Sequence, residues 1–72
     1  MMKISYDQEI DALYIRLVGG QHECRTVRLT DEVTLNIGAD EQLIGIEILD
    51  AQEVIGSLPS VELENVPLAK AA

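Results

Sequence analysis

Aliphatic residues alternate with polar residues in five short runs of this 72-residue chain, and no other feature constrains its fold as strongly. Successive side chains of a β-strand point to opposite faces, so an alternation of period two places the apolar members of each run on one face. Turn-forming residues separate the runs, among them Gly19-Gly20, which we interpret as a hairpin turn. The runs cover residues 2–6, 12–18, 23–29, 33–37 and 43–49. The sequence therefore predicts a mainly β (α+β) fold, a curled antiparallel β-meander of about five strands.

The run at residues 43–49 is apolar on one face and half apolar on the other. Ile44, Ile46 and Ile48 alternate with a second set in which Leu43 and Leu49 flank Gly45 and Glu47. A strand of this kind is covered on both faces, so we expect it to be central in the sheet. The predicted core face contains Ile4, Leu13, Ile15, Leu17, Val27, Leu35, Ile37, Ile46 and Ile48.

A short helix is predicted after the last strand, over residues 51–56. Asp50 has the position of an N-cap, and Glu53 three residues later completes a capping box. Gly56 and Pro59 end the helix. Residues 1–58 thus form a single β-meander domain, and residues 59–72 form a C-terminal tail. The alternation of Val61 and Leu63 with acidic residues allows the tail to add a strand, on this chain or a neighbouring one, before a frayed end.

One short helix is too small to cover a five-stranded sheet, although 47% of the residues are hydrophobic. Either the sheet curls into a half-barrel over the helix, or a second chain covers it, and we expect both. The sequence therefore predicts a homo-oligomer, most simply a dimer.

Charge and composition exclude several functional classes. Thirteen acidic residues against five basic ones give a net charge of −8, which argues against autonomous binding of nucleic acid and favours a basic protein partner. No apolar run is long enough to span a membrane, and the first residues lack the apolar stretch of a signal peptide. The single cysteine, with no such signal, indicates a reducing, cytoplasmic setting. No cofactor is expected.

Three segments resemble a bacterial family known as domain of unknown function 2283. They are Lys3-Ile4-Ser5-Tyr6-Asp7, Asp11-Ala12-Leu13-Tyr14-Ile15 and Gly45-Ile46-Glu47-Ile48-Leu49. The chain departs from the family pattern at Gln8, where proline is common, and at residues 35–39, which are poorer in aspartate and so less suited to a cation. The resemblance implies no enzymatic activity. It implies an antitoxin-like role, because some members occur beside small ribonuclease-like toxins.

Glu47 is the first candidate for a role beyond packing, because it is a carboxylate flanked by isoleucines. We expect it to form a structural cross-strand ion pair with Arg16, Arg25 or Arg28. The alternative is a binding or catalytic site between subunits that uses Glu47 and one of these arginines.

Two further clusters have a plain structural interpretation. Asp7, Glu9 and Asp11 are weak candidates for a hard-cation site, but they fit a turn held by aspartate side chains better. His22 and Cys24 have the spacing of two side chains on one strand face, which is more typical of surface residues than of a nucleophilic pair. The most favoured function is a non-catalytic protein-interaction module that neutralises a basic partner. The alternative is a small-ligand binder or enzyme.

Overall fold

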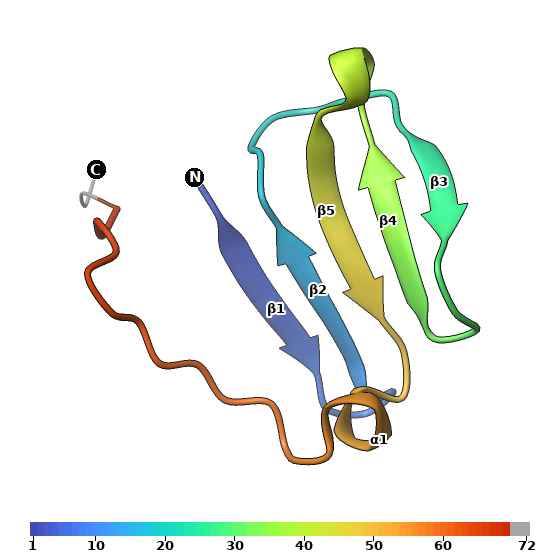
Figure 1. Ribbon diagram of the computed structural model, residues 1–72. Helices are drawn as coiled ribbons and strands as arrows, with labels where there is room; N and C mark the ends of the chain where they lie inside the picture. Colours follow the sequence, from blue (N-terminus) through green and yellow to red (C-terminus); the bar gives the residue numbers. More distant parts are fainter. Residues whose placement is uncertain (70–72) are drawn as a thin grey trace.

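The computed structural model describes residues 1–69 as an open five-stranded antiparallel sheet with one short helix at its end (Figure 1). The strand order is β1-β2-β5-β4-β3. The elements are β1 (Lys3–Asp7), β2 (Ala12–Arg16), β3 (Arg25–Arg28), β4 (Val33–Ile37), a 3₁₀ turn (Ala39–Glu41), β5 (Leu43–Ile48) and α1 (Ala51–Ile55). The mainly β fold with five antiparallel strands and one short helix is confirmed. No helix within residues 1–69 is long and apolar enough to cross a membrane.

The sheet joins a β1–β2 hairpin to a β3-β4-β5 meander, with β5 paired to both β2 and β4. This confirms the central position predicted for β5. The interpretation of Gly19-Gly20 as a hairpin turn is wrong, because β2 and β3 do not pair and residues 17–24 cross the end of the sheet instead. The backbone amides of Leu17 and Val18 both donate to the carbonyl of Ile44, which directs the chain along the end of β5.

The register aligns the apolar residues of all five strands on one face. Ile46 lies opposite Ile15 on one side and Leu35 on the other. A register shift next to Asn36 and Ile37 places Leu43, rather than Ile44, opposite Ile37. This irregularity adds a residue to β5, as a β-bulge does, and it reverses the alternation expected for the start of that strand.

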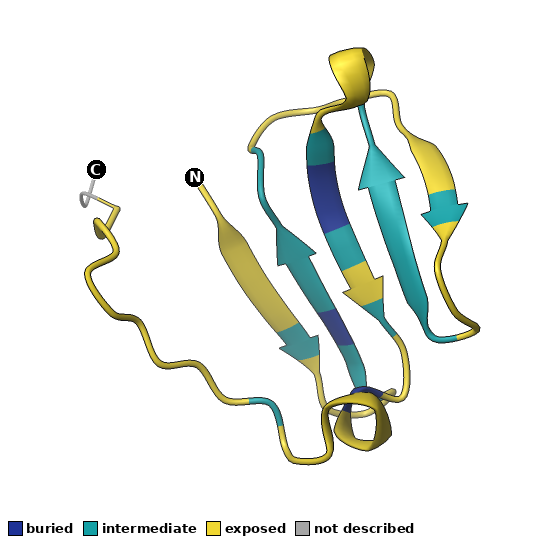
Figure 2. Cartoon of the chain, in the orientation of Figure 1, coloured by how far each residue is buried: buried dark blue, intermediate teal, exposed yellow. Residues whose placement is uncertain are grey.

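The described core is thin, because residues 1–69 leave most of the apolar face uncovered. Only Leu13, Ile44 and Ala51 are buried hydrophobic residues, whereas most of the predicted core is half-buried and Ile4 is exposed (Figure 2). The sheet is not closed, and α1 lies at the end of the sheet where β1, β3 and β5 finish (Figure 1).

The predicted capping box of α1 is also wrong. Asp50 has left-handed backbone angles (φ 49°, ψ 48°), and its side chain makes no capping hydrogen bond. The cap comes instead from Asp11 in the β1–β2 turn. Its carboxylate accepts from the backbone amide of Gln52 at 3.2 Å, and its carbonyl accepts from the amide of Ala51 at 3.0 Å. The helix ends at Gly56, whose positive φ of 87° favours glycine.

The tail, residues 57–69, has neither helix nor strand, so the sixth strand is not formed within this chain. It runs beside β1 without joining the sheet (Figure 1). The part of the expected frayed end at residues 70–72 lies outside the described residues.

Candidate functional site

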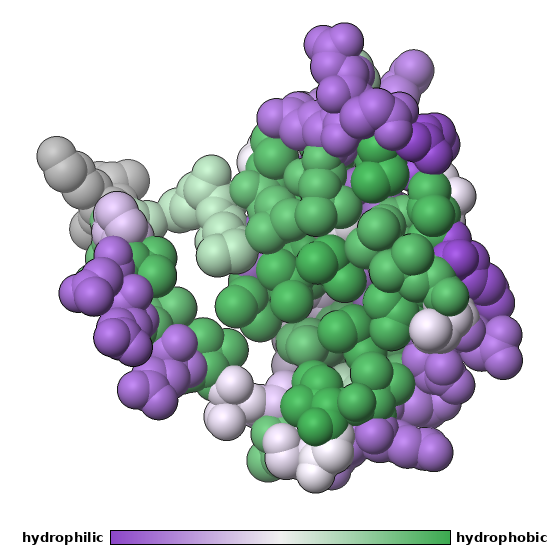
Figure 3. Space-filling view, in the orientation of Figure 1, coloured by the Kyte–Doolittle hydropathy of each residue, from purple (hydrophilic) through white to green (hydrophobic). Residues whose placement is uncertain are grey.

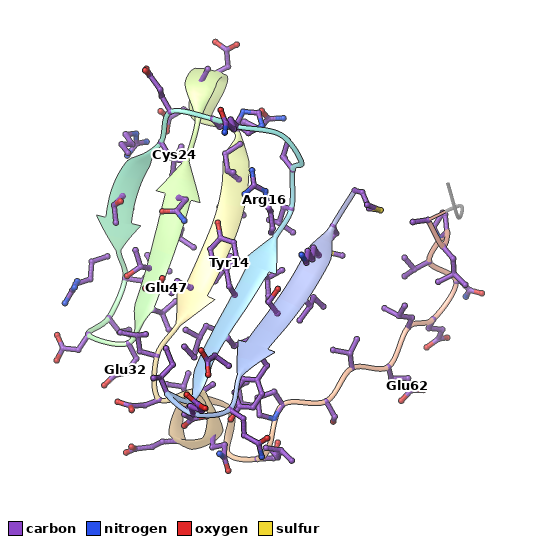
Figure 4. The ribbon with its side chains drawn as sticks, turned by 180° about the vertical axis from the view of Figure 1, so that it is seen from behind. Tyr14, Arg16, Cys24, Glu32, Glu47 and Glu62 are labelled. Atoms are coloured by element: carbon purple, nitrogen blue, oxygen red, sulfur yellow. The ribbon has the colours of Figure 1, made fainter. Side chains whose placement is uncertain are left out.

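Glu47 lies exposed on the polar face of the sheet, near the middle of its width (Figure 4). The register places it opposite Tyr14 of β2 and Thr34 of β4, so its strand neighbours are neutral.

The structure does not bring the three candidate arginines to Glu47. The Arg16 guanidinium donates to the carbonyls of Val18, at 2.9 Å, and Gly20. Arg25 pairs with Glu41, and this is the one ion pair among residues 1–69. Arg28 lies on β3 opposite Thr34 of β4, and Thr34 in turn lies opposite Glu47. One whole strand therefore separates Arg28 from Glu47. Within residues 1–69, Glu47 therefore makes no ion pair.

Tyr14 and Gly45 form a close contact on the polar face that the sequence analysis did not single out. A side-chain carbon on Gly45 would lie 2.3 Å from the Tyr14 hydroxyl oxygen, so the phenol ring lies directly over the glycine. The same hydroxyl accepts a hydrogen bond from Asn36 at 3.2 Å. The available signal was a glycine inside a strand, which often marks the close approach of another group.

Asp7 and Asp11 are used within the chain. Asp7 accepts from the amide of Glu9 at 3.0 Å, which is the predicted aspartate turn. Asp11 accepts from the Tyr6 hydroxyl at 2.6 Å. This hydrogen bond lowers the pKa of Asp11 below its ordinary 3.8 and raises the pKa of Tyr6 above 10.0. Among the described residues, no three histidine, cysteine or acidic side chains are arranged to hold a metal ion.

His22 and Cys24 are exposed, and their side chains do not contact each other. The His22 ring nitrogen Nε2 lies 2.7 Å from the carbonyl of Gly19, while the Cys24 thiol lies 3.5 Å from the backbone carbonyl of His22. Neither arrangement orients a base toward the thiol, so these residues form no nucleophilic pair here.

One end of the sheet, which we call the acidic end, carries most of the uncompensated negative charge. The β1–β2 turn, the β3–β4 turn and α1 all lie there, as the strand registers require. Arg28 is the one basic side chain at this end within residues 1–69. The carboxylates of the acidic end are Asp7, Glu9, Asp11, Asp31, Glu32, Asp50 and Glu53.

The apolar face of the sheet is largely uncovered by residues 1–69. Figure 3 shows hydrophobic side chains extending without interruption over the sheet, bordered by polar residues. The chain exposes 5784 Å², about 1,400 Å² more than the roughly 4,400 Å² expected for a compact monomer of this mass. The exposed apolar residues include Ile4 and Leu29 on the sheet side and Val61, Leu63 and Leu68 on the tail.

A family model described as "Protein of unknown function (DUF2283)" matches residues 3–52. The match spans all five strands and the beginning of α1. The resemblance drawn from the three sequence segments is thereby confirmed. No curated protein and no solved structure matches the chain.

Proposed function

We propose, from the premise that this chain belongs to the DUF2283 family of proteins of unknown function, that it is a non-catalytic protein-interaction module acting as a homodimer. The uncovered apolar face carries this proposal. A face of this extent, bordered by polar residues, is typical of a protein–protein interface. The excess of about 1,400 Å² per chain lies within the roughly 1,000–2,500 Å² that each subunit of an obligate homodimer buries.

A second copy of the same chain is the occupant that this face favours. A two-fold axis brings identical patches together, so one aliphatic face covers another with no polar group left unpaired between them. The sheet offers this complementarity, because its apolar residues align in rows across all five strands. Sheets of this kind pack face to face about 10 Å apart, with their side chains interdigitated.

The acidic end supports the second part of the proposal, which is the chemistry of the external partner. Face-to-face packing leaves the strand ends accessible, so the acidic end remains on the dimer surface. Its carboxylates, opposed by Arg28 alone, favour a basic protein, and long-range attraction speeds such an encounter. An antitoxin-like module that neutralises a small basic protein fits this surface.

The exposed Glu47 supports binding rather than catalysis. General acid–base chemistry requires a positioned partner group, and Arg16 and Arg25 are already engaged by backbone carbonyls and by Glu41. Glu47 is therefore assigned to the polar contact surface of the module.

The dimer is tested with two substitutions on neighbouring residues of β3 that point to opposite faces. Val27→Lys places a charge on the half-buried apolar face, whereas Thr26→Lys places the same charge on the exposed polar face. Light scattering should give twice 7.9 kDa for the wild type and for Thr26→Lys, and a single-chain mass for Val27→Lys. A wild type of single-chain mass at micromolar concentration contradicts the proposal.

The acidic end is tested with two triple variants of equal net charge. One carries Glu9→Gln, Asp31→Asn and Glu53→Gln at the acidic end, and the other carries Glu23→Gln, Asp40→Asn and Glu62→Gln elsewhere. Calorimetric titration with an oligolysine peptide should show weaker binding for the first variant than for the second. Equal affinities would mean that only the net charge matters and that the acidic end is not a docking surface.

A further inference from the structure

The free edge of β1 and the tail face each other across an apolar cleft of about 690 Å³. Met1, Met2 and Ile4 line one wall, and Val61, Leu63 and Leu68 line the other. We propose that in the dimer the tail of the second copy takes the place of the chain's own tail beside β1 and adds a strand to it, so that the two subunits exchange their C-terminal tails. This inference rests on the homodimer of the proposed function and specifies what its interface contains.

The tail has the side-chain pattern of a strand with one bulge. Val61 and Leu63 alternate with acidic residues, and the alternation then shifts by one residue so that Val66 and Leu68 continue it. The shift falls at Asn65, which has a positive φ of 54°. A residue in the left-handed region is a usual device for such a shift, and asparagine tolerates it well. As a result, all four apolar side chains line the same cleft.

Both sides of the cleft have unused hydrogen-bonding capacity. β1 is an edge strand that pairs only with β2. No backbone hydrogen bond joins residues 57–69 to the rest of the described chain. An unpaired strand edge is a template for the addition of an extended segment, and backbone hydrogen bonds supply part of the affinity.

The length and charge of the tail suit this position. Ten extended residues, 60–69, span about 33 Å, whereas the five residues of β1 need about 17 Å. When the apolar side chains of the tail face the cleft, Glu62 and Glu64 point to the polar side, where Lys3 of β1 lies. An antiparallel register that sets Glu64 opposite Lys3 also sets Glu62 opposite the neutral Ser5 and Ser60 opposite Asp7, so the one charged pair that it forms has opposite signs.

A second copy explains more of the exposed surface than the chain's own tail does. If its own tail closed onto β1, the apolar face over β2, β5 and β4 would stay uncovered. A two-fold axis that runs across the strands stacks the β1 edges of the two subunits, so that the tail of each can lie beside β1 of the other and both surfaces are buried by one arrangement.

The test uses full-length chains in a Cys24→Ser background, because Cys24 is an exposed free thiol. One chain carries Ser5→Cys in β1 and an isotope-labelled chain carries Glu62→Cys in the tail, both at exposed polar-face positions. The two chains are refolded together and treated with a short bis-maleimide. We expect cross-linking of about half of the material, which is the statistical share of the mixed dimer, identified by mass. Thr26→Cys on β3, at the opposite edge of the sheet, replaces Ser5→Cys in the control and should give only background cross-linking.

A chain that carries both Ser5→Cys and Glu62→Cys separates the remaining outcomes. A cross-link within one chain, with no mixed dimer, means that each tail covers its own β1 and overturns tail exchange. Absence of both cross-links in a protein that scatters as a dimer also overturns it, while the proposed homodimer stands. A wild type of single-chain mass refutes the homodimer and the exchange together.

A second variant measures what the tail contributes to association. Leu63→Ser should raise the dimer dissociation constant at least about tenfold, since it removes a large apolar side chain from the interface. Glu64→Gln, the next residue on the polar side, should change it by less than about fivefold. Equal dissociation constants for wild type and Leu63→Ser would contradict the exchange.

Discussion

Position 45 has room for a hydrogen atom but not for a side chain, because the Tyr14 phenol lies over it. The nearest backbone atom, the carbonyl oxygen of Ile15, would also lie only 3.2 Å from an added carbon. The glycine thus allows a tyrosine from β2 to lie flat across the central strand and reach Asn36 of β4. One contact in this way ties three strands together on the polar face.

Gly45→Ala should lower the free energy of unfolding by about 1–3 kcal/mol, because the added methyl displaces the phenol ring. Gly19→Ala is the matched control, since nothing lies within 4 Å of a side-chain carbon at that position. In a Tyr14→Ala background the cost of Gly45→Ala should largely vanish, as denaturant titrations of the double-mutant cycle would show. Additive effects would mean that Tyr14 is not the obstacle.

At the scale of the element, α1 depends on a residue far from it in sequence. Its first turn is capped by Asp11, which also accepts from the Tyr6 hydroxyl and so joins β1, the β1–β2 turn and the helix. A five-residue helix has little stability of its own. We therefore expect α1 to form only when the β1–β2 hairpin is in place.

Asp11→Asn should lower the melting temperature at neutral pH, whereas Asp50→Asn should leave it nearly unchanged. Both residues have positive φ, which asparagine tolerates, so the comparison isolates the capping role. The pKa of Asp11 is lowered in the folded state, so its stabilising effect is present above its ordinary value of 3.8. This effect is lost as pH falls through the lowered pKa. Melting curves recorded across this range should show the wild type and Asp11→Asn converging in acid.

The sequence predicted the strands and the helix, but it did not predict the connections and long-range contacts between them. Alternation located all five strands and the central β5, because burial of one face imposes a period of two on each strand. The β-bulge before Gly45, the crossing at residues 17–24 and the Asp11 cap depend on contacts between distant residues, so no local pattern reveals them. Glu47 was expected on a half-apolar face beside an arginine, but it is exposed, Arg25 pairs with Glu41, and Arg16 donates to backbone carbonyls.

At the scale of the whole molecule, the described core of the single chain is small. Ile44 is 2% exposed and belongs to the core of the single chain, whereas Ile46 is only half-buried at the centre of the open face. Ile44 therefore tests the packing of the single chain, whereas Ile46 tests whether a second chain covers the open face.

If the proposed homodimer forms, Ile44→Ala should lower the free energy of unfolding by about 2–5 kcal/mol and leave the dimeric mass unchanged. Ile46→Ala should instead weaken the dimer, so that its melting temperature depends more steeply on protein concentration than that of the wild type. Calorimetric scans over a range of concentrations test this contrast. Identical concentration dependence in the two variants would show that Ile46 is not covered by a second copy.

The strand order has a consequence for how the chain reaches its native state. The β1–β2 hairpin and the β3-β4-β5 meander each form between neighbours in sequence, but β2 and β5 are separated by residues 17–42. Closing that loop has an entropic cost that is repaid only when the two halves meet, so this step is expected to be slow. Until then each half has an unpaired edge that accepts the matching half of another molecule. The pairing of β2 with β5 is therefore the step at which chains at high concentration would pair with one another instead of within one molecule, and dilution should favour correct refolding.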